Sequence, residues 1–247
     1  MAKIMKEITS INNEYIKKLC KLKEKKYRDE EKLFIVEGYH LVKEAKEYLQ
    51  EVLITKEEDY IEGVTNILVT DNIIEKLSSV KTPQMIIGIC KYFDKTEVTG
   101  DKFLILDGVQ DPGNLGTLIR TALGFKIDTI ICSLDTVSIY NEKVIRATQG
   151  AIFNINYVIG DLKEIINKLK KDNVSIISTS LENGTELKKV NLDEVNKYGI
   201  ILGNEGNGVR KDIQELATFN VRIEMDKRLE SLNVGVAGAI LMYYMMK

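Results

Sequence analysis

Apolar residues in the first third of the chain change their spacing from a helical period to short β-type runs. In residues 11–22 they recur every three or four positions, which predicts a helix capped at its start by Ser10. Four strands are then predicted at Leu33–Val36, Val52–Thr55, Ile67–Val69 and Met85–Cys90. Helical patterns lie between them at His40–Leu49 and Asn72–Leu77. This alternation predicts a small α/β unit that ends near residue 93.

A second alternation follows a polar stretch at residues 94–101, which has the composition of a linker. Strands are predicted at Phe103–Leu106, Thr129–Cys132, Ile155–Val158, Val174–Thr179, Ile200–Leu202 and Val221–Ile223. The helices between them are predicted at Leu115–Leu123, Glu142–Gln149, Leu162–Lys171 and Lys211–Leu216. The pattern is typical of a parallel sheet, so we expect an α/β protein with a first domain at 1–93 and a second at 102–247.

The last predicted helix, Val234–Met246, is apolar on nearly every side. A helix of this kind must be buried, either in the core of its own domain or against a second subunit. The sequence alone favours the core.

Composition restricts the class of protein. Of 247 residues 44% are hydrophobic, 29% are charged and 2 are prolines, which is typical of a globular chain. The 3 cysteines form no CxxC motif and there is 1 histidine, so neither a disulfide framework nor a His/Cys metal site is expected. No secretion signal or stretch of 18 uncharged apolar residues is present, and we expect a cytoplasmic protein with buried thiols.

The charge is unevenly distributed. Residues 1–28 carry nine basic and three acidic groups, a net of +6, so the total of −2 leaves −8 for the remainder. A basic segment on an acidic body is consistent with a local phosphate-binding patch that includes Lys25, Lys26 and Arg28. A solvated helix face explains the same charges.

Three loops follow predicted strands of the second domain, where ligands of open parallel sheets bind. The first is Asp107–Arg120, with the sequence DGVQDPGNLGTLIR, in which a helix begins near Asn114. Its glycines allow a close approach of the backbone to a ligand, but they match neither GxGxxG nor a P-loop. Arg120 could face the same cleft as Asn114, although a glycine-rich turn with a surface arginine is an equally good reading of this pattern.

The second loop, Leu202–Val209 (LGNEGNGV), holds Glu205 among glycines and asparagines, and the third, Glu230–Asn233 (ESLN), leads into the closing helix. Ser231 and Asn233 could simply cap that helix. The three loops contain no histidine, cysteine pair or carboxylate dyad. This absence disfavours the usual acid–base, thiol and metal mechanisms and favours transfer from an activated donor by positioning.

The three loops resemble the three motifs of the SpoU (TrmH-type) RNA ribose methyltransferases of the SPOUT superfamily. Asp107–Arg120 is similar to the first motif, Ile201–Val209 to the second and Ile223–Ala237 to the third. Lys25–Gly38 (KKYRDEEKLFIVEG) resembles the basic residue and Phe-x-x-Glu-Gly strand of the RNA-binding domain of many members. The resemblance therefore covers nearly the whole chain.

This resemblance implies a deep trefoil knot in the second domain, a homodimer with the closing helix at its interface, and S-adenosylmethionine as methyl donor without a metal. It implies a catalytic set of Asn114, Arg120, Glu205, Ser231 and Asn233. The donor would lie against Leu202, Gly203, Gly208, Ile223, Met225 and Leu232, and RNA against Lys25, Lys26 and Arg28. The chain departs from the family pattern at Glu224, Lys227 and Gly235.

The expected function is therefore methylation of a ribose 2′-hydroxyl in structured RNA, with ribosomal RNA favoured over transfer RNA. Two alternatives remain open at this point. One is an inactive RNA-binding or ribosome-assembly protein of the same fold. The other is a nucleotide-dependent oxidoreductase, which the missing GxGxxG and the missing ribose-binding acid disfavour.

Overall fold

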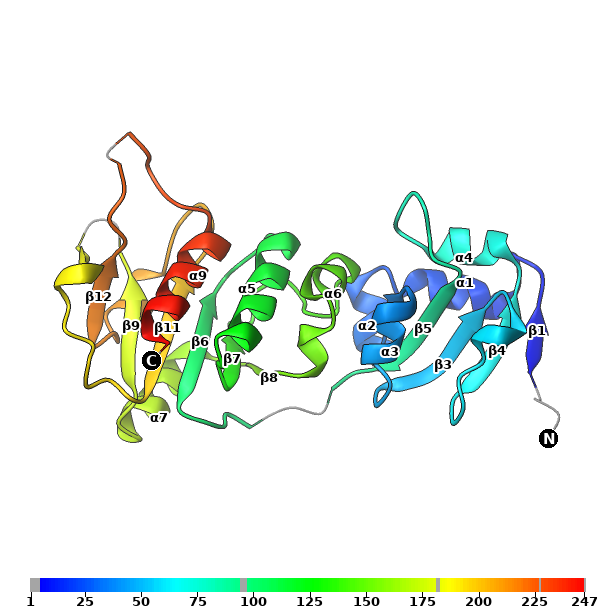
Figure 1. The fold of residues 1–247 in the computed structure, drawn as a ribbon, viewed down its shortest axis with the longest axis horizontal. Coiled ribbons are helices and arrows are strands. Elements are labelled where there is room, and N and C mark those ends of the chain that lie inside the picture. Colours follow the sequence, from blue (N-terminus) through cyan, green and yellow to red (C-terminus); the bar gives the residue numbers. More distant parts are fainter. Residues whose placement is uncertain (1–4, 94–96, 181–182, 227, 247) are drawn as a thin grey trace. The chain divides into compact units, whose positions relative to one another are not determined.

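The computed structural model describes residues 5–93, 97–180, 183–226 and 228–246 (Figure 1). The chain forms two compact units, each drawn from two segments. The first unit contains Met1–Asp94 and Ser138–Phe153, and the second contains Lys95–Val137 and Asn154–Lys247. The predicted linker at 94–101 begins with three residues, 94–96, that lie outside the described ones.

The first unit is built on a mixed five-stranded sheet in the order β1-β4-β3-β5-β2. Strands β1, β4 and β3 run parallel, while β5 is antiparallel to both β3 and β2. The strands are β1 (Lys6–Ile8), β2 (Leu33–Glu37), β3 (Leu49–Ile54), β4 (Thr65–Val69) and β5 (Ile86–Lys91). The helices of this unit are α1 (Glu14–Lys21), α2 (Lys25–Glu31), α3 (Tyr39–Glu44), α4 (Asp71–Leu77) and α6 (Glu142–Thr148), with single 3-10 turns η1 (Glu57–Asp59) and η2 (Ala151–Phe153).

The four strands predicted in this unit are confirmed, and two helix boundaries need correction. Asn13, not Ser10, caps α1, since its side-chain oxygen accepts a hydrogen bond of 2.9 Å from Tyr15 N. The helix predicted at 40–49 ends at Glu44 because Leu49 already belongs to β3. Strand β1 and helix α2 were not predicted; both are short, and their sequences, KEI and KKYRDEE, are mostly charged.

Helix α6 lies between β7 and β8 in the sequence but packs against β2 of the first unit. Aromatic rings fix the segment 138–153 there. The Tyr140 ring lies 5.0 Å from Phe34 and stacks on Tyr92 at 3.6 Å between centroids, and its hydroxyl accepts a hydrogen bond of 2.9 Å from Phe93 N. Phe153 stacks on Tyr48 at 5.9 Å. A piece of chain from the middle of the second alternation thus completes the first unit.

The second unit is built on a seven-stranded sheet in the order β10-β12-β9-β11-β6-β7-β8, and every strand pair is parallel. The strands are β6 (Lys102–Asp107), β7 (Thr129–Cys132), β8 (Asn156–Ile159), β9 (Ser175–Thr179), β10 (Thr185–Glu186), β11 (Tyr198–Gly203) and β12 (Phe219–Arg222). The helices are α5 (Pro112–Gly124), α7 (Leu162–Lys171), α8 (Lys211–Gln214) and α9 (Val234–Met245), with a 3-10 turn η3 (Leu187–Lys189). The predicted α/β class with a parallel sheet is confirmed.

Helices α5 and α9 lie side by side against the sheet (Figure 1). Gly238 makes this packing possible, because a Cβ at this position would lie 2.5 Å from Leu118 Cδ2 and 2.7 Å from Leu202 Cδ1. Met242 and Leu241 are buried, whereas Val236 and Tyr243 on the other face of α9 are exposed. The closing helix therefore has a buried face in the core of its own unit and an apolar face that this unit leaves uncovered.

Candidate active site

Asn114 is placed by the way in which helix α5 begins. Strand β6 ends at Asp107, and a short loop leads to Asp111, the N-cap of α5. The Asp111 carboxylate accepts a hydrogen bond of 2.8 Å from Asn114 N, and Pro112 stands at the start of the helix, where its lack of an N–H costs nothing. These local rules hold the Asn114 side chain at the carboxyl-terminal edge of the parallel sheet.

Glu205, in the loop after β11, contacts the beginning of helix α5. One carboxylate oxygen accepts hydrogen bonds from Asp111 N (3.1 Å) and Asn114 Nδ2 (3.0 Å), and the other accepts from Gln110 N (3.1 Å). Burial raises the pKa of this carboxyl, but the hydrogen bonds from Asn114, Gln110 and Asp111 outweigh it and leave the pKa below its ordinary value. Glu205 is therefore an ionised carboxylate that connects the first two loops by hydrogen bonds, and not a proton donor.

Asn233 brings in the third loop. It is the N-cap of α9, and its side-chain oxygen accepts hydrogen bonds from Gly235 N (2.9 Å) and Val236 N (3.3 Å). Its Nδ2 donates to Asn114 Oδ1 at 2.8 Å. Asn114 thus accepts from Asn233 and donates to Glu205. Three of the five predicted catalytic side chains form one hydrogen-bonded chain, which joins the three sequence motifs.

Arg120 and Ser231 are not part of this chain. Both are exposed, and within the described part of the molecule neither side chain has a hydrogen-bond or ion-pair partner. Arg120 stands six residues after Asn114 on α5, about 9 Å further along the helix axis. Its guanidinium is free to engage a ligand or another molecule, and its catalytic role remains a prediction.

The residues predicted to hold the methyl donor surround the same edge. Leu202 and Gly203 end β11 and are buried, and a Cβ on Gly203 would lie 2.0 Å from Gly208 C, so only glycine allows the loop to fold back on its strand. Asn204 and Gly208 close that loop by two backbone hydrogen bonds of 2.9 and 3.0 Å.

The three other apolar residues predicted to hold the donor are all half-buried: Ile223, Met225 and Leu232. Ile223 follows β12, which ends at Arg222, one residue earlier than predicted. Glu224 is exposed and Gly235 is buried against Thr117, while Lys227 lies outside the described residues. The role of these residues in holding the methyl donor remains a prediction.

One pair of charged residues that supports the site was not predicted from the sequence. The Asp107 carboxylate is fully buried and accepts hydrogen bonds from Arg210 N and Nε, both at 2.8 Å, with Nη2 2.7 Å away. Asn204 Nδ2 also donates to Gly108 O at 2.9 Å. These contacts connect the first and second loops, in addition to the hydrogen bonds made by Glu205. The sequence did contain a signal for this pair. Asp107 ends the apolar run FLILD, and a carboxylate at the end of a buried strand needs a charged or hydrogen-bonding partner.

The predicted RNA-binding role of Arg28 needs correction. Its side chain is buried at 3% exposure, and Nη1 donates to the carbonyls of Leu22 (2.9 Å) and Lys23 (2.7 Å), which lie at the end of α1. The guanidinium therefore closes a helix instead of facing solvent. Lys25 and Lys26 on α2 are exposed, and Lys26 Nζ lies 5.7 Å from the centre of the Tyr27 ring.

Comparison with known proteins identifies the family. Residues 101–243, more than half of the chain, match the model of the SpoU rRNA methylase family. The chain belongs to this family. Residues 13–88 match an MRM3-like substrate-binding domain. Membership makes the protein a methyltransferase that uses S-adenosylmethionine, as predicted.

The relatives include a protein of Bacillus subtilis named 23S rRNA (guanosine(2553)-2′-O)-methyltransferase RlmP. It is 34% identical over 248 residues, which cover 98% of this chain and 99% of the relative. Among solved structures, an AdoMet-bound rRNA methyltransferase from Sinorhizobium meliloti has a TM-score of 0.86 at 28% identity, covering 97% of this chain and 96% of its own. The SpoU methyltransferase AviRb from Streptomyces viridochromogenes, at 18% identity, a TM-score of 0.83 and coverage of 94% and 96%, shares the fold.

The described residues lack two further features. They contain no group of three or more His, Cys, Asp or Glu side chains that could hold a metal ion. No helix among them is long and apolar enough to cross a membrane.

Proposed function

We propose that this SpoU-family protein methylates the 2′-hydroxyl of a ribose in ribosomal RNA, as a cytoplasmic enzyme. The observation that supports the proposal most is the chain Glu205–Asn114–Asn233, which assembles all three motifs at one edge of the sheet. The Bacillus subtilis relative is named for a guanosine of 23S rRNA. A guanosine ribose of the large-subunit RNA is therefore the first target to examine.

The donor supplies a methyl group on a sulfonium, and the task of the protein is to hold the 2′-oxygen in line with it and to stabilise the charge that this oxygen develops. Asn114 and Asn233 orient the ribose, and Glu205 keeps Asn114 in position. Arg120 holds a neighbouring phosphate and stabilises the developing alkoxide. A guanidinium stays protonated in ordinary surroundings, so we assign the proton to another acceptor.

Two measurements test the function. Calorimetric titration with S-adenosylmethionine should show saturable binding, and NAD, the control ligand, should show none. Ribosomal RNA from cells that lack the gene should miss one 2′-O-methyl group, which the purified protein should restore in vitro as seen by mass spectrometry. Binding of RNA without binding of S-adenosylmethionine would instead support an inactive assembly protein of the same fold.

We propose that Lys25 and Lys26 contact the RNA backbone. Changing both to glutamine should weaken RNA binding and lower the slope of log K against log salt by about 1.5, because two phosphate contacts are lost. Fluorescence anisotropy at several salt concentrations measures both effects. The control removes the same charge from α7 by changing Lys168 and Lys171, which are exposed in the second unit. An unchanged salt slope in the Lys25/Lys26 variant would exclude this role.

We also propose a homodimer formed through the exposed apolar face of α5 and α9. Val236 (50% exposed), Ile240 and Tyr243 (67% exposed) lie on α9, and Leu123 on α5 is exposed as well. Exposed apolar patches of this kind mark interaction sites. Changing Val236 and Ile240 to glutamate should convert the dimer to a monomer in analytical ultracentrifugation. Leu134→Glu, at the exposed leucine after β7, should leave it dimeric. A monomeric unaltered protein would refute the proposal.

A further inference from the structure

A pocket of about 440 Å³ lies at the carboxyl-terminal ends of β7 and β8, outside the three motif loops. The turn after β7 supplies Leu134 and Asp135 to its wall, the start of α7 supplies Asp161 and Lys163, and Arg210 supplies the side toward the active site. This is the edge of a parallel sheet at which ligands bind. None of its lining residues except Arg210 has a part in the site described above.

Two large apolar side chains are exposed at this edge of the sheet, one in the pocket wall and one next to the pocket residue Gly160. Leu134 is 72% exposed, and Ile159, the last residue of β8, is 47% exposed. The register of the two strands pairs Cys132 with Ile159, so Leu134 follows directly beyond this pair at the same edge. Exposed apolar side chains beside convergent polar groups are typical of a binding site for a flat, partly apolar ligand.

The polar groups of the pocket include both donors and acceptors. Arg210 is anchored by Nε and Nη2 to the buried Asp107, and its Nη1 has no partner among the described residues. The pKa of the Asp135 carboxyl is lowered, mainly by a hydrogen bond from Ser133 and further by the positive charge of Arg210. Asp135 is therefore a charged hydrogen-bond acceptor. Lys163 Nζ contacts Asp212 at 2.8 Å and offers a further donor.

The charge of the pocket selects among ligands. Among the lining residues, Asp135, Asp161 and Asp212 contribute −3 and Lys163 and Arg210 contribute +2, which leaves −1. The buried Asp107, which pairs with Arg210 from behind the lining, brings the total to −2. A phosphate would be repelled by this balance. A neutral planar group that offers an amino donor beside a carbonyl acceptor fits it, because carboxylates accept from such amines and arginine donates to such carbonyls. Among nucleobases, guanine and cytosine have both groups on one edge.

The pocket and the active site share one loop. Gly108 N donates to Ser133 Oγ at 2.9 Å, and the Gln110 side chain donates to Asp135 O, so the 108–111 loop is fastened on the pocket side. On its other side, Gln110 N and Asp111 N bind Glu205. A ligand in the pocket is therefore separated from Glu205 and Asn114 by a single loop.

We propose that this pocket binds an unstacked guanine or cytosine base of the RNA substrate, close to the nucleotide whose ribose is methylated. The proposal rests on the proposed function. RNA specificity is generally read from unstacked bases through their Watson–Crick edges. Leu134 packs against the face of the base, and Asp135 and Arg210 bind its amino and carbonyl groups.

The test compares the RNA affinity of Leu134→Ser and Asp135→Asn with that of the unaltered protein. Both side chains are exposed, so the fold should be unaffected. Loss of a hydrogen bond to a charged group should weaken RNA binding of Asp135→Asn about tenfold or more, and Leu134→Ser should lose a few-fold. The affinity for S-adenosylmethionine should stay the same in both.

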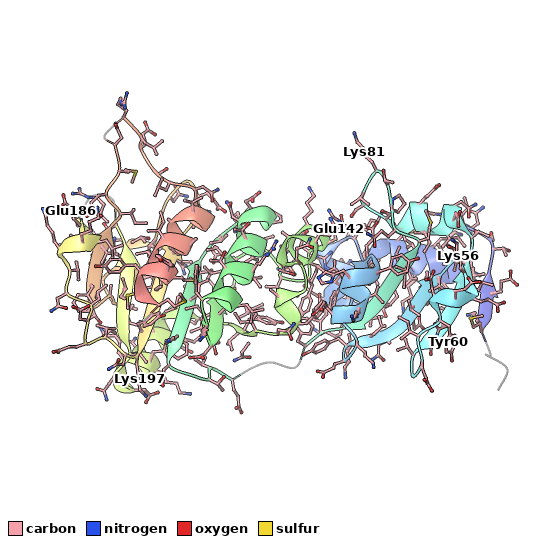
Figure 2. The ribbon with its side chains drawn as sticks, viewed as in Figure 1. Lys56, Tyr60, Lys81, Glu142, Glu186 and Lys197 are labelled. Carbon is pink, nitrogen blue, oxygen red and sulfur yellow. The ribbon has the colours of Figure 1, made fainter. Side chains whose placement is uncertain are left out.

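The matched control is Glu194→Gln, which makes a carboxylate-to-amide change in a pocket of about 460 Å³ at the opposite end of the strands. Lys197, marked in Figure 2, lies in that pocket just before β11. This variant should bind RNA normally. In a second experiment, amide NMR shifts of Leu134 and Lys163 should respond to the nucleosides guanosine and cytidine and much less to adenosine and uridine.

The outcomes separate the two proposals. Unchanged RNA affinity in both variants, or a loss equal to that of Glu194→Gln, overturns the base pocket and leaves the methyltransferase function intact. Reduced affinity for S-adenosylmethionine instead of RNA also overturns it, since the pocket would then hold the donor. Selective loss of RNA binding in a protein that methylates no ribose would keep the pocket and reject the proposed function. An unaltered protein that binds no RNA overturns both.

Discussion

Arg120→Ala is expected to lower kcat for methyl transfer about 10²- to 10³-fold and to leave the unfolding temperature unchanged. The kinetic loss follows from removing a preorganised donor that stabilises the developing alkoxide. The stability should not change because the Arg120 side chain is exposed and has no partner within the described structure. Single-turnover methylation of the target RNA at saturating S-adenosylmethionine measures the chemical step, and calorimetry confirms that donor binding is retained.

Arg120→Lys separates charge from shape. Lysine keeps the positive charge but cannot form the paired hydrogen bonds of a guanidinium with a phosphate. We therefore expect most of the loss to persist in this variant. Activity close to that of the unaltered protein in Arg120→Lys would contradict the need for the bidentate group, and activity close to it in Arg120→Ala would remove Arg120 from the mechanism.

Arg210→Met should lower the free energy of unfolding by about 3 kcal/mol, because it leaves the buried Asp107 carboxylate without its countercharge. The Asp107 side chain is 0% exposed, although that of Arg210 is 51% exposed. Urea unfolding followed by circular dichroism measures the change. The second variant, Asp107→Asn with Arg210→Met, should recover part of the loss because the buried charge is gone.

Arg228→Met is the control for this experiment. Arg228 also binds an aspartate through two hydrogen bonds, to both oxygens of Asp226, but its side chain is 91% exposed and that of Asp226 57%. Exposed pairs contribute little to stability, so the change should stay within about 0.5 kcal/mol. Equal effects of Arg210→Met and Arg228→Met would show that burial of Asp107 does not determine the energy of its pair.

Features set by local sequence were the most predictable. Helix α7 has the predicted bounds because a capping aspartate, an apolar stripe and a lysine-rich end all agree. The capping role of Asn233 was foreseen as an alternative to catalysis, and the structure shows the cap together with a hydrogen bond to Asn114. An N-cap uses only the side-chain oxygen, which leaves the amide nitrogen available for a second contact.

Features set by distant partners were not predictable. Arg28 belongs to a basic run, and nothing in that run shows that its guanidinium turns inward to two carbonyls at the end of α1. The pairing of Asp107 with Arg210 joins residues 103 positions apart. The packing of α6 also contradicts its place in the sequence, since a helix between two parallel strands ordinarily covers their own sheet.

The segment 138–153 means that neither unit is encoded by one continuous stretch of gene. A protein cut within residues 97–101 should stay together as a noncovalent pair, because Tyr140 and Phe153 remain embedded among Phe34, Tyr48 and Phe93. A fragment that stops at residue 93 would expose those rings to water and favour aggregation. Exchange of the first unit between relatives must therefore transplant two separate pieces of sequence, because Tyr140 and Phe153 of the aromatic cluster are encoded between two strands of the second unit.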